Sequence, residues 1–333
     1  MNALVSRLRR RPEAGVLLIA LVVMVVLHPL MPDATVSLQQ VLVRASTAGL
    51  IAIGLTVVIV QGHFDLSVGT TYALGAIFTI FAGTSNPGLA ILAAAAIGLV
   101  LGLINGFIVG VMGINSLIAT IATGSIGLGL AYLITDEAPV QGNNVAGAIA
   151  FLKPVWWVIT PPVIIFLIAL IILQLFMFRT RTGRDFYAIG GYRDAARAAG
   201  IPVRWRVFQG FIISGLCAAI GGWLTAIKLD AANPNQSIGV ALLAVAAVVI
   251  GGTALTGGTG SPLGTALAAL LLAWIGSTFD AEGMSAMVRD ITYGSILLLV
   301  VAADQFADGV RAIRRQVGRR IRLISSRRGA ATG

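Results

Sequence analysis

The chain has 333 residues, of which 57% are hydrophobic and only 11% are charged, and its mean hydropathy is +0.94. A soluble domain carries about a quarter charged residues, so this composition excludes an ordinary soluble protein and indicates a polytopic membrane protein. The net charge of +10 does not favour nucleic-acid binding, because the basic residues lie at the ends of apolar segments and in the tail. The single cysteine, Cys217, excludes a disulfide framework and a metal cluster.

Apolar segments of bilayer-spanning length, about 20 residues each, recur along the chain. We expect ten spans, near residues 14–31, 41–60, 66–83, 88–112, 117–135, 155–178, 207–228, 238–256, 262–279 and 287–304. The predicted fold is all-α, a polytopic membrane helical bundle of about ten transmembrane helices that forms a single domain over residues 1–333. Glycines four apart at Gly98, Gly102 and Gly106 predict close helix packing.

The basic residues predict the orientation of the bundle. Of the 23 basic residues, 4 precede the first span, 7 are arginines in the long loop 179–206, and 8 lie from Arg311 onward. Ten spans place these 19 residues on one side, and Lys and Arg in short loops accumulate on the cytoplasmic face. We therefore expect both termini, the loop 179–206 and the basic tail 305–333 to be cytoplasmic, where they also contact anionic membrane lipid.

A polar break, Gln61 to Gly69, separates the second and third expected spans. An aspartate and a histidine at such a place are costly unless they reach water, a partner or a substrate path. Two interpretations of Asp65 stay open: a short turn in which it caps the third span, or a place near the substrate path or its gate. Two asparagines, Asn105 and Asn115, fit helix-to-helix hydrogen bonds or caps better than ligand contacts.

A second break, residues 251–264, holds six glycines in fourteen residues. A phosphate-binding P-loop would require a lysine followed by serine or threonine. The two lysines of the chain, Lys153 and Lys228, precede Pro154 and Leu229, so the chain holds no such nucleotide site. We expect the glycines to allow close backbone packing at the inner ends of two spans.

Within the long loop, residues 192–200 predict a short helix, rich in alanine and ended by Gly200. Arg193 and Arg197 stand four residues apart and share one face of that helix. Two interpretations remain open: a basic helix that lies on anionic lipid, or a rigid helix that enters a pocket of a cytoplasmic protein.

Together these segments resemble the permease subunits of bacterial ATP-binding-cassette (ABC) importers for simple sugars, the ribose-type family. The resemblance runs from about residue 40 to 305 and is carried by Asp65-Leu-Ser-Val-Gly69, Thr182-Gly-Arg184, Tyr187-Ala-Ile-Gly-Gly191, Ala195-Ala-Arg-Ala-Ala-Gly-Ile201 and Ala246 to Gly260. Branched-chain amino-acid permeases are relatives that differ around the Asp-Leu-Ser-Val-Gly motif. His63 and Phe64 depart from the small or aliphatic residues common there, which puts a preference for ribose itself in doubt.

The resemblance implies a non-enzymatic transport subunit in the bacterial inner membrane. A second permease chain, identical or closely similar, completes the channel, a periplasmic sugar-binding protein delivers the substrate, and a separate cytoplasmic ABC ATPase binds ATP and Mg²⁺, so this chain itself has no cofactor, metal site or catalytic residue. Coupling to the ATPase falls on residues 190–201, with Arg193, Asp194 and Arg197 as exposed contacts between Gly191 and Gly200. Asp65, Ser67 and Asn115 are the candidates for the substrate path or gate, and the outer loop 136–153 is a surface for the binding protein.

Rival hypotheses differ in substrate or energy source. An ABC permease for a polyol, an autoinducer or an amino acid would share the same architecture. A stand-alone secondary carrier would need buried ionisable groups for ion coupling, which the spans lack. A membrane-embedded enzyme that uses His63 and Asp65 lacks an accompanying nucleophile or metal set.

Overall fold

The computed structural model describes residues 36–285, 287–289, 291–296, 298 and 302. Within them the chain is almost entirely helical. The spanning helices and their short companions are α3 (Leu38–Val60), α4 (Val68–Ala82), α5 (Pro87–Gly106) with the π-helical turn η1 (Phe107–Val111), α6 (Ser116–Thr135), α8 (Pro161–Arg179), α11 (Val203–Leu229), α12 (Ser237–Ile250) and α13 (Pro262–Ala281). The shorter elements are β1 (Val140–Gln141), α7 (Val145–Phe151), α9 (Arg181–Gly191), α10 (Arg193–Ala198), β2 (Ala231–Ala232) and the 3₁₀ turn η2 (Pro234–Gln236).

Eight of the ten expected spans correspond to helices in the described region. Six helices are long and apolar enough to cross a membrane, and Val68–Ala82 and Pro234–Ile250 are shorter apolar helices. The expected span 14–31 lies outside the described residues, and 287–304 lies only partly within them. The structure therefore confirms a helical membrane bundle, whereas the total of ten spans and the cytoplasmic location of both termini stay predictions.

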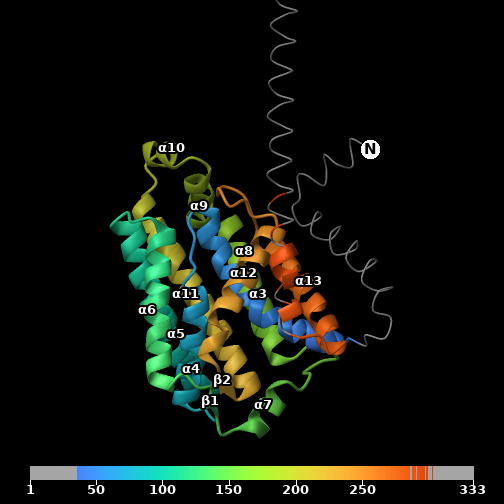
Figure 1. The fold of residues 1–333 in the computed structure, drawn as a ribbon. Helices are drawn as coiled ribbons and strands as arrows, with labels where there is room; N and C mark the ends of the chain where they lie inside the picture. The colour runs from blue at the N-terminus through green and yellow to red at the C-terminus, as the bar shows by residue number, and fades with distance from the viewer. Residues whose placement is uncertain (1–35, 286, 290, 297, 299–301, 303–333) are drawn as a thin grey trace, which may run out of the picture.

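Helix α3 forms the centre of the bundle. The spanning window of α3 is 89% buried, compared with 72% for α11 and 78% for α13. It packs against α8, α11, α12 and α13, and α11 also packs against α4 and α5 (Figure 1). A helix that is apolar on every side and buried on every side belongs in the interior of a bundle. In contrast, α5 and α6 are only 22% buried and carry many exposed large apolar side chains, as expected of helices that face lipid or another chain.

Small residues set a close helix contact between α5 and α11. A Cβ atom on Gly98 would lie 2.5 Å from the carbonyl oxygen of Gly215, and one on Gly102 would lie 2.8 Å from that of Phe211. Gly106 approaches Phe208 in the same way. Glycines four residues apart thus let the two backbones touch, which confirms the packing that the sequence predicts.

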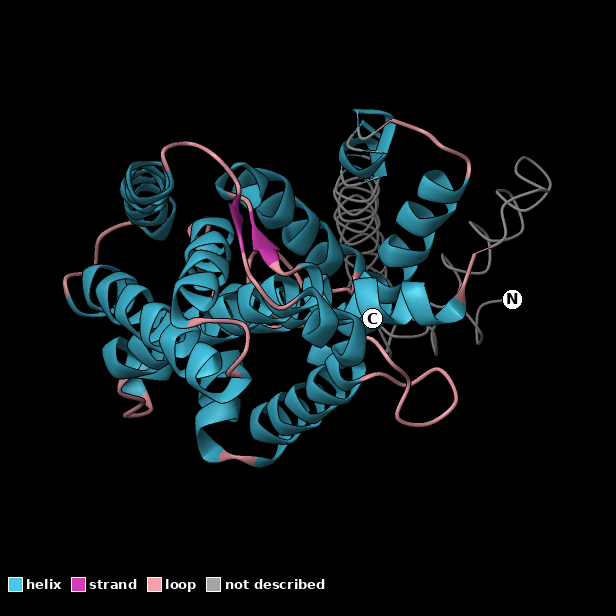
Figure 2. Cartoon of the chain, turned by 90° about the horizontal axis from the view of Figure 1, so that it is seen from below, coloured by secondary structure: helices cyan, strands magenta, loops and turns pink. Residues whose placement is uncertain are grey.

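The connecting segments gather at two opposite ends of the bundle (Figure 1). We call the end that holds the loop 61–67, α9, α10 and the loop 251–261 the arginine end. The other end, the strand end, holds β1, β2 and α7, and Figure 2 looks onto it. There β1 and β2 pair antiparallel, with Val140 opposite Ala232. The alternation of the helices between the two ends agrees with the predicted order of spans.

One expected span is shorter in the structure. Helix α12 ends at Ile250, six residues before the predicted limit of 256. The helix stops because Gly252 takes the left-handed conformation, with φ +82°. Gly251 beside it crosses the start of α13 so closely that a Cβ atom there would lie 2.6 Å from the backbone nitrogen of Thr265. Glycine permits this close approach because it has no side chain.

Candidate functional site

The break between α3 and α4 is held by hydroxyl groups of α6. Gly62 has φ +77°, a left-handed conformation that ends α3. The freed backbone amides then find side-chain partners: Phe64 donates to Oγ of Ser116 at 3.0 Å, and Leu66 donates to Oγ1 of Thr120 at 3.1 Å. Non-helical backbone at such a place requires hydrogen-bond partners inside the protein, and α6 supplies them.

Asp65 is the centre of a buried hydrogen-bond network in this break. The side chain is only 3% exposed. Its Oδ1 atom accepts hydrogen bonds from the hydroxyl and the backbone amide of Ser67, at 2.5 and 3.1 Å. Its Oδ2 atom accepts a hydrogen bond from Oγ of Ser214, on α11, at 2.9 Å. Both carboxylate oxygens are therefore satisfied within the protein, as a buried carboxylate requires.

The network continues from Ser67 into two further helices. Nδ2 of Asn105, on α5, donates to Oγ of Ser67 at 2.8 Å, and Oγ1 of Thr123, on α6, donates to Oδ1 of Asn105 at 2.7 Å. We call Asp65, Ser67, Asn105, Thr123 and Ser214 the Asp65 network. It connects the start of α4 to α5, α6 and α11, so a movement of the break would pull on the hydrogen bonds to all three helices.

Three residues were expected at the substrate path or gate, and the structure joins only two of them. Asp65 and Ser67 share the network. Ser67 is the N-cap residue of α4 but makes no capping hydrogen bond with its own side chain, whereas Asp65 accepts the amide of Ser67 just before the helix. Asn115 is exposed and caps α6, accepting hydrogen bonds from the amides of Leu117 at 2.9 Å and Ile118 at 3.4 Å. A role of these residues in the substrate path stays a prediction.

The sequence does not reveal the long-range members of the Asp65 network. Ser214, which bonds Asp65, and Thr123, which bonds Asn105, are hydroxyl residues inside long apolar segments, and such residues give no sequence signal of their own. Asn105, in contrast, makes the helix-to-helix hydrogen bond that its place in an apolar segment predicts.

Backbone from three distant segments meets at the arginine end. We call Val60–Gly62, Gly190–Gly191 and Gly257–Gly258 the glycine junction. The amide of Gly258 donates to the carbonyl oxygen of Val60 at 2.8 Å. A Cβ atom on Gly190 would lie 1.9 Å from that same oxygen. The junction confirms the close backbone packing expected of the glycine-rich segment 251–264, and it joins the end of α3 to two of the segments on which the family resemblance rests.

Helix α9 connects this junction to the long arginine loop. Phe186 and Ile189 are buried, and the carboxylate of Asp185 pairs with the guanidinium of Arg206 on α11 at 2.9 Å. The hydroxyl of Tyr187 donates to the carbonyl oxygen of Gly260 at 2.9 Å. The helix is therefore fixed to the bundle on one side and to the loop 251–261 on the other, although the sequence analysis predicted no helix there.

Helix α10 is the short helix predicted for residues 192–200. Gly200 follows it with φ +79°, the left-handed conformation expected of a glycine stop. Ala196 is buried and faces inward, whereas Asp194 and Arg197 are exposed and lie 3.8 Å apart. Figure 1 shows α10 beyond the ends of the spanning helices. Its outer surface is therefore open to a partner.

Arg193 differs from the expected exposed contact because its side chain is half-buried. Its Nε atom is buried and has no hydrogen-bond partner among the described residues. Burial lowers the pKa of its guanidinium, and the neighbouring charge of Arg197 lowers that pKa further. Burial and then the charge of Arg193 also lower the pKa of His63 to about 4, so His63 is neutral at neutral pH. Arg193 thus faces the break as well as the surface.

At the strand end, Asp230 links the end of α11 by hydrogen bonds to the segment after α4 and to the loop 136–153. Its Oδ1 atom accepts a hydrogen bond from the hydroxyl of Thr84 at 2.6 Å, and its Oδ2 atom accepts one from the amide of Asn144 at 2.7 Å. Its carbonyl oxygen accepts the amide of Gly142 at 2.7 Å. These bonds fix the loop 136–153, which was expected to be a partner surface, against the ends of α4 and α11.

A cavity of about 1140 Å³ opens at the same end of the bundle, beside the end of α11. Its polar lining comes from α3, α4, α11, η2, α13 and the segment after α13, and comprises Gln39, Gln40, Arg44, Thr47, Tyr72, Thr225, Lys228, Asn235, Gln236, Ser277, Asp280 and Arg289. Ligand pockets usually measure about 300–1,000 Å³, so the cavity has room for a small saccharide. In the described parts of the chain, no three His, Cys, Asp or Glu side chains gather as a metal site would require.

Comparison with known proteins identifies the family of the chain. Residues 37–301 match the family described as "Branched-chain amino acid transport system / permease component". The D-allose transport system permease protein AlsC of Escherichia coli K12 is 30% identical over 297 residues, which cover 87% of this chain and 91% of the relative. The L-arabinose transport system permease protein AraH of the same organism is 32% identical, with 78% and 80% covered.

The ribose import permease protein RbsC of Bacillus subtilis is 33% identical over 87% of this chain and 90% of the relative. No solved structure matches the chain. The match spans most of the described bundle and includes the break, the glycine junction and α10. The chain is therefore a multi-pass membrane protein that belongs to the family of permease components of branched-chain amino acid transport systems.

Proposed function

We propose that this chain is the membrane-spanning permease subunit of an ATP-driven ABC importer that carries a simple sugar from the periplasm across the bacterial inner membrane. The observation that carries the proposal is that relatives named for allose, arabinose and ribose match over 78–87% of the chain. The family description names branched-chain amino acids instead. We favour sugars because the relatives match over most of their own length and because amides and hydroxyls dominate the polar lining of the strand-end cavity.

The partners of the proposed importer follow from the same assignment. A cytoplasmic ABC ATPase binds the arginine end, a periplasmic sugar-binding protein binds the strand end, and a second permease chain, identical or closely similar, completes the channel. Asp194 and Arg197 present a charged, exposed surface on α10, and the buried Ala196 anchors that helix to the bundle. These features support α10 as the element that the ATPase holds.

Contacts through the arginine end give a route by which ATPase movement reaches the spans. Helix α10 follows α9 directly, and the last two residues of α9 lie in the glycine junction. The junction holds the end of α3, after which the break leads to the Asp65 network. In this proposal a shift of α10 displaces the break and, through Ser214, Asn105 and Thr123, moves α11, α5 and α6 together. The Asp65 network then acts as the inner gate or its hinge.

The test is reconstitution of the chain in proteoliposomes with its ATPase and binding protein. We expect uptake of a saccharide that requires ATP and all three components. The variant Arg197→Glu reverses an exposed charge on α10, so we expect it to reduce ATPase co-purification at least tenfold while the chain still inserts. Lys153→Glu, an exposed charge reversal at the strand end, is the matched control and leaves co-purification unchanged.

Two results would contradict the proposal. Saccharide uptake by the chain alone, driven by an ion gradient, would indicate a secondary carrier. Equal ATPase co-purification of Arg197→Glu and the wild type would remove α10 as the coupling element.

A further inference from the structure

The strand-end cavity carries more positive than negative charge. Its charged lining residues in the described part of the chain are Arg44, Lys228, Arg289 and Asp280. Three cations thus face one carboxylate. A cavity with walls of low dielectric focuses such an imbalance and attracts ions of opposite sign.

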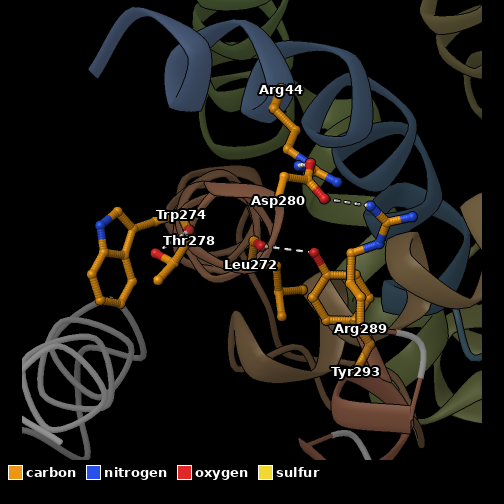
Figure 3. A network of polar contacts seen from close by, with 7 residues as sticks. All are labelled: Arg44, Leu272, Trp274, Thr278, Asp280, Arg289 and Tyr293. Atoms are coloured by element: carbon orange, nitrogen blue, oxygen red, sulfur yellow. Dashed lines mark hydrogen bonds and ion pairs between the residues drawn. The ribbon is translucent and has the colours of Figure 1, made fainter. Parts of the chain in front are cut away.

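The one carboxylate, that of Asp280, already forms ion pairs with two of the cations. Oδ2 of Asp280 contacts Nη1 of Arg44, and Oδ1 accepts a hydrogen bond from Nη1 of Arg289 at 3.0 Å. Figure 3 shows Asp280 between the two guanidinium groups, one from α3 and one from beyond α13. Because each carboxylate oxygen already meets an arginine, Asp280 neutralises no further charge in the cavity.

The packing around this group is specific. A Cβ atom on Gly276 would lie 3.0 Å from Cζ of Arg44 and 2.2 Å from the hydroxyl oxygen of Tyr293. That hydroxyl donates to the carbonyl oxygen of Leu272 at 3.1 Å (Figure 3). The absence of a side chain at Gly276 therefore lets Arg44 and Tyr293 lie against α13. Arg44 is held in place rather than free to turn out into solvent.

Lys228 is the third cation and stands near the end of α11. Its side chain is only partly exposed and lines the cavity. Within residues 36–285 and the described residues beyond them, its ammonium makes no hydrogen bond and no ion pair. A partly buried cation at the mouth of a membrane bundle is costly without an anionic partner, and such residues mark ligand or ion paths. A negatively charged group on a ligand would supply such a partner.

The neutral polar residues of the cavity suit the hydroxyl groups of such a ligand. Neutral side-chain amides of Gln40, Asn235 and Gln236 can both donate and accept hydrogen bonds, as sugar hydroxyls require. Oδ1 of Asn235 accepts the hydroxyl of Tyr132 at 2.9 Å, which fixes the orientation of that amide. Polar neutral groups beside a lysine that pairs with no described carboxylate match a polyhydroxylated molecule that bears one acid group.

We infer that the importer carries a sugar acid, an aldonate or uronate, and that Lys228 is the contact for its carboxylate in the strand-end cavity. The inference rests on the proposed function and narrows its substrate class. The sugars in the names of the relatives, allose, arabinose and ribose, are uncharged. A neutral sugar would leave the charge of Lys228 unmatched, whereas a carboxylate forms a charge-assisted hydrogen bond with it.

The experiment compares each neutral sugar with its acid: D-galactose with D-galacturonate, which keeps the ring and differs only at C6, and D-ribose with D-ribonate, which is an open-chain aldonate. Uptake is measured in proteoliposomes that hold the chain, its ATPase and its binding protein. We expect the acid of at least one pair to enter at least tenfold faster than the neutral sugar. Lys228→Met removes the charge at similar length and is expected to lower uptake of the acid about tenfold or more, with uptake of any neutral sugar changed less than about twofold.

A second measurement separates the permease from the binding protein. The purified chain in nanodiscs is melted with and without the same acid at millimolar concentration. Ligand that binds the folded protein raises the melting temperature. We expect a rise with the acid, none with the neutral sugar, and none with the acid in Lys228→Met. Lys153→Met changes the only other lysine of the chain, which is exposed and lies outside the cavity lining, and it should behave as the wild type.

The outcomes distinguish this inference from the proposed function. ATP-dependent uptake of neutral sugars alone would overturn the inference and leave the proposed function intact. Uptake of neither kind of saccharide would overturn both. An equal loss of acid and neutral uptake in Lys228→Met, or a loss of ATPase stimulation by the binding protein without sugar, would assign Lys228 to structure or docking and overturn the inference.

Discussion

Adjacent glycines at the end of α9 allow a sharp test of the glycine junction. Gly190 and Gly191 share the same helix, and neither has a positive φ, so alanine suits the backbone at both. A Cβ atom on Gly190 would lie 1.9 Å from the carbonyl oxygen of Val60 and 2.5 Å from the amide of Gly258, both of them backbone atoms. A Cβ atom on Gly191 would meet nothing within 4 Å. We expect Gly190→Ala to open the junction and Gly191→Ala to be tolerated.

The expected cost follows from three contributions. Overpacking of a tight contact costs about 1–3 kcal/mol. The methyl group would also separate the hydrogen-bonded Gly258 and Val60, a loss of about 0.5–1.5 kcal/mol. Alanine gains at most about 1 kcal/mol of helix propensity over glycine. By these magnitudes, Gly190→Ala should lower the free energy of unfolding by about 2–3 kcal/mol. Gly191→Ala should show only the small gain in helix propensity.

Thermal unfolding of the two purified variants in nanodiscs measures this difference. A loss of this size lowers the melting temperature by several degrees, about 2–4 °C for each kcal/mol in a chain of a few hundred residues. In the reconstituted importer, Gly190→Ala should also lower ATP-dependent uptake more than it lowers ATPase binding, because α10 itself is unchanged. Equal melting temperatures and equal uptake for the two variants would refute the contact across the junction and the route of coupling through it.

Three further predictions concern single side chains. Asp230→Ala removes the acceptor that holds the loop 136–153, so we expect a loss of about 2–4 kcal/mol and faster proteolysis of that loop; Asp136→Ala, an exposed residue of similar left-handed conformation, is the control and should leave both unchanged. Asn105→Leu breaks the Asp65 network and should cost about 1–3 kcal/mol by thermal melting, whereas Thr123→Ser keeps its hydroxyl and should cost little. His63 lies outside the spanning helices, and its pKa in the folded protein is lowered to about 4 from 6.5. The neutral form is favoured on folding, so about 3 kcal/mol of stability present above pH 6.5 is lost as the pH falls to 4; His63→Gln should flatten that dependence, and an unchanged acid profile would contradict the burial of the imidazole.

Most spanning helices were predictable because a lipid bilayer forces the backbone to satisfy its own hydrogen bonds. The expected segments 117–135 and 262–279 agree closely with α6 and α13. The first turn of α8 begins later than expected, at Pro161, because Thr160 and two prolines start the helix after the exposed Trp156 and Trp157. Proline at the first helical position is favourable, and that local signal is sharper than hydropathy.

The candidate site was only partly predictable. The sequence marks the break at Asp65, the glycine-rich loop and the short helix α10 because aspartate in an apolar stretch, clustered glycines and an alanine-rich segment ended by glycine each carry a local physical meaning. It did not show that Arg193 faces inward, since residues four apart on a short helix differ in exposure according to what the helix packs against.

By itself the sequence determined a helical membrane bundle whose long loop 179–206 gathers seven arginines at one end, because hydropathy and charge act through the solvent and need no partner residue. Tertiary structure alone decided which polar groups meet. Ser214 reaches Asp65 across 149 residues, and Arg44 reaches Asp280 across 236. It also decided that Lys228 lines a cavity in which it pairs with no carboxylate of the described residues. Contacts of this kind depend on how the helices pack, and helix packing is set by the shapes of many small side chains at once.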